Sequence, residues 1–263
     1  MATDLAALVT RVADEAGPAS LLAHPSQVRL GRADPGGPAA RPASTNQPDA
    51  LADELAIAGI TPLSSCDWPG RLVTTVFLQG CPWRCTYCHN SAILDPRTPG
   101  VVAWAGVRDL LSRRRGLLDG VVFSGGEPTR QRGLVAAAQD VRDAGLQVGL
   151  HTGGAFPAAL ARALPHVDWV GFDVKAPARL YDAITRRGGA AQAFASLRLV
   201  LDSGVDVQVR TTVDPTVLTS ADVAELTAAL AEEGVRDHVL QVVRTDGTTS
   251  EYRAAYAAVR DRT

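Results

Sequence analysis

Short apolar runs alternate along this chain with longer segments whose apolar residues recur every three or four positions. The runs predict six buried strands, at Arg71–Gln79, Gly120–Phe123, Leu146–His151, Trp169–Val174, Val205–Val213 and His238–Arg244. The amphipathic segments predict helices at Val101–Arg115, Gln131–Ala144, Pro157–Leu164, Ala190–Ser203, Ser220–Glu233 and Glu251–Arg260. Strands that alternate with helices in this way are typical of parallel βαβ units.

A barrel and a flat doubly wound sheet would both produce this order of elements, and the position of the polar motifs favours the barrel. Four polar segments come at or just after predicted strand ends: Gly80–Asn90, Ser124–Thr129, His151–Gly154 and Asp173–Lys175. A (β/α) barrel builds its site at the carboxyl ends of its strands. We therefore predict an α/β fold, an incomplete (β/α)6 TIM-type barrel of parallel strands.

The first 50 residues differ in composition from the rest of the chain. They are rich in proline, alanine and glycine, most clearly at Asp34–Pro38. Such a segment cannot bury much apolar surface, so we predict a flexible, poorly ordered extension over residues 1–50 and a barrel domain over residues 51–263.

Charge and hydropathy limit the kinds of partner. The 263 residues carry a formal net charge of −2, which gives no electrostatic reason to expect nucleic acid or a membrane surface. No apolar run approaches the roughly 20 residues of a membrane span, and Met1–Gly17 lacks the pattern of a signal peptide. A cytoplasmic location is the expectation, and its reducing environment favours metal binding over disulfides for the four cysteines.

The strongest chemical signal is a group of three cysteines on one predicted loop. Cys81, Cys85 and Cys88 are separated by three and two residues, so their thiolates can converge on one polynuclear metal site. Three protein ligands on a four-iron cube leave one iron open for chemistry. The alternative is structural zinc with His89 as fourth ligand, although zinc modules usually place their ligand pairs on separate knuckles.

Two motifs together resemble the radical S-adenosylmethionine (SAM) superfamily. CxxxCxxC with an aromatic residue, Tyr87, before its last cysteine is the superfamily's signature, and here it follows a strand that ends at Gln79. The segment Phe123–Thr129, with sequence FSGGEPT, follows the next strand and resembles the superfamily's GGE motif. The resemblance covers about residues 60–244.

This resemblance implies a [4Fe–4S] cluster on the three cysteines, with the amino and carboxylate groups of SAM on the open iron. Gly125 and Gly126 let the backbone approach the ligand closely, and Glu127 can accept a hydrogen bond from the SAM ammonium group. No residue is given a catalytic role beyond the cluster and SAM.

Further contacts with SAM are implied by the same resemblance. Tyr87 and His89 correspond to residues around which the adenine packs. Asp173 and Lys175 point to the same side of their strand and resemble a DxK element that contacts SAM. Arg210, on the fifth strand, can reach the ribose or the mouth of the cluster site.

Within the superfamily, the chain most resembles the glycyl-radical activating enzymes, and among them the anaerobic ribonucleoside-triphosphate reductase activating proteins. The resemblance rests on Asp67-Trp-Pro-Gly70 and on Cys88-His-Asn90. The sequence departs from that group at His151, where an aspartate is common, which puts in doubt any cation site that the aspartate would provide.

The implied reaction is that of an oxidoreductase. One electron from a flavodoxin or ferredoxin cleaves SAM to methionine and a 5′-deoxyadenosyl radical, which abstracts a glycine hydrogen from a partner glycyl-radical enzyme, here anaerobic ribonucleoside-triphosphate reductase. One alternative is a small-molecule radical SAM enzyme such as a 7-carboxy-7-deazaguanine synthase-like protein. The other, from a different class, is a non-catalytic zinc-binding module.

Overall fold

The computed structural model describes residues 51–261. The extension predicted over residues 1–50 lies outside this range. The strands are β1 (Ile57–Ser64), β2 (Val73–Leu78), β3 (Gly120–Gly125), β4 (Gln147–Thr152), β5 (Trp169–Asp173), β6 (Asp206–Val213) and β7 (His238–Val242). The helices are α3 (Trp104–Arg113), α4 (Leu134–Asp143), α5 (Pro157–Ala163), α6 (Tyr181–Thr185), α7 (Ala190–Ser203), α8 (Ser220–Glu232) and α9 (Ser250–Arg260).

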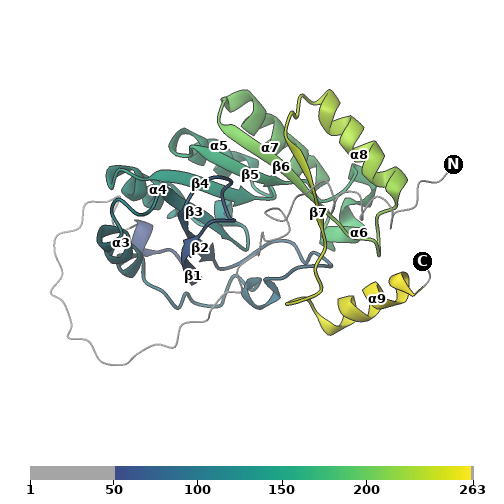
Figure 1. Cartoon of the computed structure of the whole chain (residues 1–263), viewed down its shortest axis with the longest axis horizontal. Coiled ribbons are helices and arrows are strands. Elements are labelled where there is room, and N and C mark those ends of the chain that lie inside the picture. Colours follow the sequence, from purple (N-terminus) through teal and green to yellow (C-terminus); the bar gives the residue numbers. More distant parts are fainter. Residues whose placement is uncertain (1–50, 262–263) are drawn as a thin grey trace.

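The strands form one curved sheet in the order of the sequence, β1 to β7. Neighbouring strands from β2 to β7 pair in parallel, and these are the six strands that the apolar runs predicted. Among the described residues β7 does not pair with β1, so the barrel stays open. Figure 1 shows α4, α5, α7 and α8 following the sheet on one side, with α9 apart from them beyond β7. The predicted incomplete barrel is confirmed.

Strand β1 is an element that the apolar pattern did not predict. It pairs antiparallel with β2, with irregularities in its register between Ile57 and Gly59 and between Thr61 and Ser64. Pro62 and Leu63 in its second half are exposed, and a proline in a strand is tolerated at a sheet edge because it has no N–H to donate. The mixed burial of this edge strand explains why no regular alternation marks it in the sequence.

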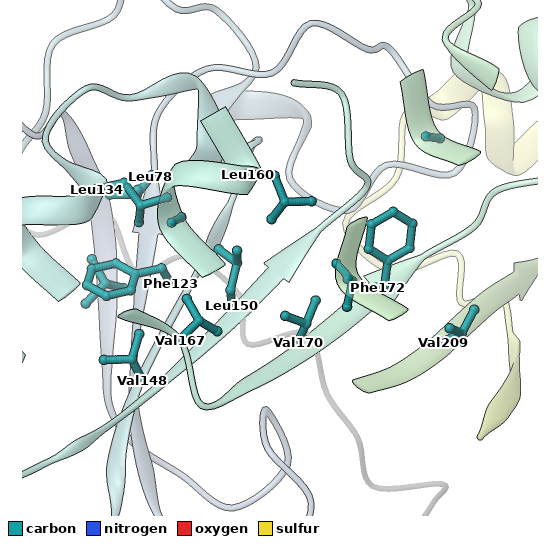
Figure 2. Packing of buried hydrophobic residues seen from close by; sticks show 14 of the residues in the cluster. Leu78, Phe123, Leu134, Val148, Leu150, Leu160, Val167, Val170, Phe172 and Val209 are labelled. Atoms are coloured by element: carbon teal, nitrogen blue, oxygen red, sulfur yellow. The ribbon is translucent and has the colours of Figure 1, made fainter. Parts of the chain in front are cut away.

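The main core lies between the sheet and its covering helices. Figure 2 shows Leu78, Phe123, Leu150 and Val170, one from each of four neighbouring strands, packed in one layer. Because both faces of these strands are buried, their sequences are mostly apolar and do not alternate regularly between apolar and polar residues.

A smaller core fills the inner side of the sheet at the opposite end from the strands' carboxyl termini. Trp68, from the loop between β1 and β2, stacks on Trp169 with ring centroids 5.3 Å apart. Gly149 makes room for this loop, because a Cβ there would lie 2.9 Å from the Trp68 ring. The Trp68 loop therefore fills the inside of the barrel at the amino ends of the strands. Polar side chains lie near the carboxyl ends of the strands. No helix between residues 51 and 261 is long and apolar enough to cross a membrane.

Candidate cofactor site at the carboxyl ends of the strands

The cysteine loop follows β2 and is held by backbone hydrogen bonds on both sides. Gly80 N donates to Ile93 O at 2.8 Å and Cys81 N donates to Leu94 O at 3.1 Å. Further along, the amides of Arg84 and Thr86 donate to the carbonyls of Thr185 and Ile184, at 2.8 and 2.9 Å. The loop therefore has a defined path between the segment that follows it and the end of α6.

All three loop thiols are half-buried, and none forms a disulfide. Burial raises the pKa of Cys81 to about 12 and that of Cys85 to about 11. Burial also raises the pKa of Cys88. These thiols are therefore protonated near pH 7 in the protein alone, and a bound metal would supply the positive charge that makes them thiolates.

The kind of donor on the loop limits which metal group it could hold. No three His, Cys, Asp or Glu side chains between residues 51 and 261 are grouped so that they could hold one metal ion as they stand. The loop offers three thiols, Cys81, Cys85 and Cys88, and none of them is in a disulfide. On a four-iron cube each of three thiolates would bind its own iron, so three thiols on one loop fit an iron–sulfur cluster.

The glycine pair after β3 lies directly against β2 and the start of the cysteine loop. A Cβ on Gly125, which has φ +110°, would lie 2.4 Å from Leu78 N. A Cβ on Gly126 would lie 2.3 Å from Gly80 O, the acceptor of a 2.9 Å hydrogen bond from Glu127 N. The absence of side chains thus allows the turn to pack on the base of the cysteine loop, a role in addition to the predicted approach to SAM.

Glu127 is buried, and both of its carboxylate oxygens are engaged by the protein. Oε1 accepts hydrogen bonds from Thr129 N, Thr129 Oγ1 and Thr152 Oγ1, at 3.1, 2.6 and 2.7 Å. Oε2 accepts from Gly153 N at 3.0 Å. Burial raises the pKa of this carboxyl group, an effect that these donors oppose. Glu127 thus joins the ends of β3 and β4, and its contact with the SAM ammonium stays a prediction.

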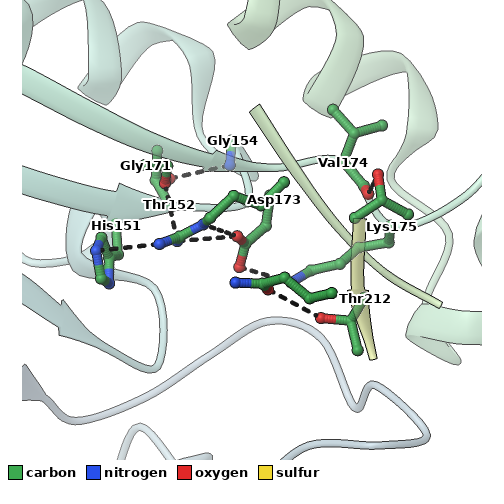
Figure 3. A network of polar contacts seen from close by, with 12 residues as sticks. His151, Thr152, Gly154, Gly171, Asp173, Val174, Lys175 and Thr212 are labelled. Atoms are coloured by element: carbon green, nitrogen blue, oxygen red, sulfur yellow. Dashed lines mark hydrogen bonds and ion pairs between the residues drawn. The ribbon is translucent and has the colours of Figure 1, made fainter. Parts of the chain in front are cut away.

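The end of β5 carries a charged network that Figure 3 shows from close by. Asp173 accepts from Lys175 Nζ at 3.0 Å and from Arg210 Nε at 2.9 Å. Although burial alone would raise the pKa of Asp173, the charges of Arg210 and Lys175 hold it well below its usual range. The Lys175 side chain is 14% exposed and that of Asp173 is 32% exposed, so this ion pair is half-buried at the end of the strand.

Two cations face one carboxylate in this network, which leaves one positive charge in excess. Burial opposes the charged form of Lys175, but Asp173 raises its pKa well above the usual range. Arg210 also donates to Gly171 O at 3.3 Å, so it is fixed inside the barrel. An excess positive charge at this end of the barrel suits a ligand with a carboxylate group.

His151 belongs to the same network, which the sequence did not reveal. Its Nε2 lies 2.7 Å from Asp67 O, its Nδ1 lies 3.2 Å from Ser124 Oγ, and Arg210 Nη1 lies 3.2 Å from Nε2. Burial and then the charge of Arg210 lower the pKa of His151 to about 4. The ring is therefore neutral near pH 7 and fits beside Arg210 without adding a third cation.

Two predicted adenine contacts, Tyr87 and His89, lie on either side of Cys88. The Tyr87 side chain is buried, and its hydroxyl has no hydrogen-bond partner within residues 51–261. A buried hydroxyl without a partner is costly, so this atom indicates space for a polar group that is not part of the chain. His89 Nδ1 lies 2.7 Å from Asp246 O, in the segment before α9.

The profile of one protein family, described as the radical SAM superfamily, matches residues 75–230, which include the cysteine loop, the glycine pair and the Asp173 network. The chain belongs to the radical SAM superfamily. It is therefore an enzyme of that superfamily, as the two motifs predicted, and membership implies a [4Fe–4S] cluster and SAM as cofactors.

Two curated proteins are similar over most of their length. The pyruvate formate-lyase-activating enzyme of Clostridium pasteurianum is 31% identical over 63% of this chain and 71% of its own. A protein of Methanocaldococcus jannaschii, named as a candidate glycyl-radical enzyme activating enzyme, is 27% identical over 65% of this chain and 73% of its own.

Solved structures support the fold. Streptococcus suis SuiB has a TM-score of 0.52 at 12% identity over 70% of this chain and 44% of its own. The AdoMet-bound structure of anSMEcpe has a TM-score of 0.51 at 17% identity over 63% of this chain and 49% of its own. This chain thus spans less than half of each.

Proposed function

We propose that this chain is a glycyl-radical activating enzyme whose [4Fe–4S] cluster is held by Cys81, Cys85 and Cys88. The observation that carries the proposal is the position of the three thiols on one loop, beside the glycine pair and at the same end of the barrel as the Asp173 network. The two similar activating enzymes support the choice of reaction class.

The residues of the chain would orient and shield the cofactors. When bound, the cluster and SAM supply a one-electron cleavage that yields a radical able to abstract a hydrogen atom. Lys175 would bind the carboxylate end of SAM, while Asp173 keeps Lys175 charged and in place. The Tyr87 hydroxyl and the turn at Gly125 and Gly126 would line the space beside them.

His89 and Arg210 would contribute less directly to binding SAM. The contact of His89 Nδ1 with Asp246 O holds one edge of the imidazole ring, so a flat ligand would stack on a face of the ring. Arg210 donates hydrogen bonds to Asp173 and to Gly171 O. We therefore propose that its main role is to balance the charge of the pocket, and that contact with the ribose is secondary.

The partner we propose is a glycyl-radical enzyme, with anaerobic ribonucleoside-triphosphate reductase as the first candidate and a flavodoxin or ferredoxin as electron donor. The support is the resemblance at Asp67–Gly70 and Cys88–Asn90, together with a sheet that stays open between β7 and β1. An open side can admit the glycine-bearing loop of another protein, which has to come within contact distance of the radical.

The test is to incubate the reduced, cluster-loaded enzyme and SAM with the candidate reductase and to record an electron paramagnetic resonance spectrum. A doublet from one α-hydrogen coupling, lost when the reductase glycine is replaced by alanine, would support the proposal. A parallel reaction with a pyruvate formate-lyase from the same genome distinguishes the two partners. SAM cleavage without a protein radical on either partner would refute glycyl-radical activation.

A second candidate is a small-molecule radical SAM enzyme of the 7-carboxy-7-deazaguanine synthase-like type. It is favoured by the contact between His89 and Asp246, because this contact brings the C-terminal segment onto the cysteine loop. A segment in that place would narrow the opening through which a protein substrate reaches the cofactors. SAM cleavage that depends on a small substrate, with no protein radical, would be its signature in the same assay.

A further inference from the structure

A fully buried carboxylate outside the predicted site connects the cysteine loop with the C-terminal helix. Asp214, just after β6, accepts a 2.6 Å hydrogen bond from Thr86 Oγ1 on Oδ2. Its Oδ1 accepts from Tyr252 OH at 2.9 Å, and also from Thr216 N and Thr216 Oγ1 at 3.0 and 2.7 Å. Four hydrogen bonds to one carboxylate make a strong junction, since bonds to a charged acceptor are the stronger ones.

The position of Thr86 gives this junction its importance. Thr86 lies between Cys85 and Tyr87, and its amide is bound on the other side to Ile184 O of α6. The middle of the cysteine loop is therefore held from two directions, by α6 through the backbone and by Tyr252 of α9 through Asp214.

A second contact joins the same two segments. His89 Nδ1 lies 2.7 Å from Asp246 O, and Gly247 lies beside His89, where a Cβ would make an ordinary contact of 3.4 Å with His89 O. Thr86, two residues before Cys88, thus binds the carboxylate that accepts from Tyr252, and His89, directly after Cys88, contacts Asp246.

Helix α9 is attached to the barrel along one stripe only. Tyr252 is buried, Tyr256 and Val259 are half-buried, and the other residues of α9 are exposed. The superfamily match ends at residue 230, before β7 and α9 begin. Asp246 and Tyr252 therefore lie in a part of the chain that the superfamily profile does not include, whereas Asp214, which joins Tyr252 to Thr86, lies within it.

We propose that α9 is part of the cofactor site and that Asp214 is its positioning residue. By bonding Tyr252 to Thr86, Asp214 holds the loop so that Cys85, Cys88 and Tyr87 face the cofactors. This inference rests on the proposed function of the three cysteines, and it adds a segment that neither the motifs nor the comparisons assign to the site.

The first experiment needs no cofactor. Hydrogen–deuterium exchange of the cluster-free protein is compared for wild type, Tyr252→Phe and Tyr256→Phe. Tyr256 lies one turn further along α9, with its ring 6.2 Å from that of Tyr252, and it is not part of the Asp214 junction. The exchange rate of the amides across residues 84–89 should rise about tenfold in Tyr252→Phe and should stay at the wild-type rate in Tyr256→Phe. The tenfold figure is the lower end of the effect expected when a hydrogen bond to a charged acceptor is lost. Equal exchange in all three proteins would overturn the proposal.

The second experiment uses the reconstituted enzyme and two changes at Thr86. Thr86→Val removes the hydroxyl, whereas Thr86→Ser keeps it. In Thr86→Val the paramagnetic resonance spectrum of the reduced cluster should change and SAM affinity should fall about tenfold, while Thr86→Ser should resemble wild type. A purely structural contact would lower the unfolding temperature of Thr86→Val but leave spectrum and affinity unchanged, which would refute positioning.

The two proposals fail in different ways. A wild-type protein that binds neither iron nor SAM after anaerobic reconstitution would refute the proposed function. A wild-type protein that binds both, with Tyr252→Phe and Thr86→Val indistinguishable from it in spectrum, affinity and exchange, would refute only the role of Asp214 and α9.

Discussion

Replacing Gly126 by alanine tests whether the turn after β3 must lie against the cysteine loop. The new Cβ would lie 2.3 Å from Gly80 O and 2.6 Å from Gly80 C, both backbone atoms that no side-chain rotation can move away. To reach even 3.0 Å, the two segments must separate by about 0.7 Å. That movement would stretch the 2.9 Å hydrogen bond from Glu127 N to Gly80 O beyond the normal range.

The expected loss of stability follows from these contacts. Overpacking of a close contact costs about 1–3 kcal/mol, and the weakened hydrogen bond costs about 1 kcal/mol more. The smaller conformational entropy of alanine in the unfolded chain offsets about 0.5–1 kcal/mol of this. We expect Gly126→Ala to lower the free energy of unfolding by roughly 1–3 kcal/mol.

Urea denaturation of the cluster-free protein measures this difference, and Gly106→Ala is the matched control. Gly106 lies in α3, is exposed and has no other atom within 4 Å of the position of its Cβ. The same substitution there should raise stability by about 0.5–1 kcal/mol, because alanine favours a helix. A Gly126→Ala protein as stable as wild type would refute the close approach of the turn to the loop.

Four further predictions concern the cofactor site and the extension. Alanine in place of any of the three loop cysteines should abolish iron binding, whereas Cys66→Ala should retain it; iron analysis after anaerobic reconstitution decides. Lys175→Ala should weaken SAM binding about 10- to 150-fold, as measured by calorimetry, while the cluster stays bound. An unchanged SAM affinity would mean that Lys175 serves only as the ion-pair partner of Asp173. His151 has a pKa of about 4 in the folded protein, below the 6.5 of the free side chain, so acid favours the unfolded state, in which the ring can be protonated. The free energy of unfolding of wild type should therefore fall by about 2 kcal/mol relative to that of His151→Asn as the pH falls from about 6.5 to 4. The same dependence of stability on pH in both proteins would contradict this. Deletion of residues 1–50 should leave SAM cleavage intact, and a truncated protein that binds the cluster without cleaving SAM would assign the extension to the site.

The parallel strands and the cysteine loop could be predicted because the sequence signal for each is local. A buried strand such as β2 is a short run of mainly apolar and β-branched residues, which can be recognised without information from the rest of the chain. The spacing of the three cysteines is also contained in eight residues. Alternation along a strand is also local: it indicates that Asp173 and Lys175 point to the same side, and in the structure the two side chains form a 3.0 Å ion pair.

Other features depend on contacts between distant segments and leave no local pattern. Strand β1 owes its place to pairing with β2, and the five-residue helix α6 is too short to show helical periodicity. His151 is 59 residues from Arg210, and the two meet because β4 and β5, and then β5 and β6, pair in parallel. The resemblance described above indicates only that His151 stands at a position where an aspartate is common.

Glu127 and Asp214 show how a polar residue near a predicted site can serve the scaffold. Each is a buried carboxylate with four hydrogen bonds from its own protein, and each joins segments that are remote in sequence. Because a buried carboxylate is costly without donors, such a residue organises the backbone around it. Glu127 joins the ends of β3 and β4, and Asp214 joins the cysteine loop to α9. The positions of the three thiols would then depend on these two carboxylates as well as on the cysteine motif itself. Substitution of either carboxylate should therefore alter cofactor binding, although neither residue need touch the cofactors.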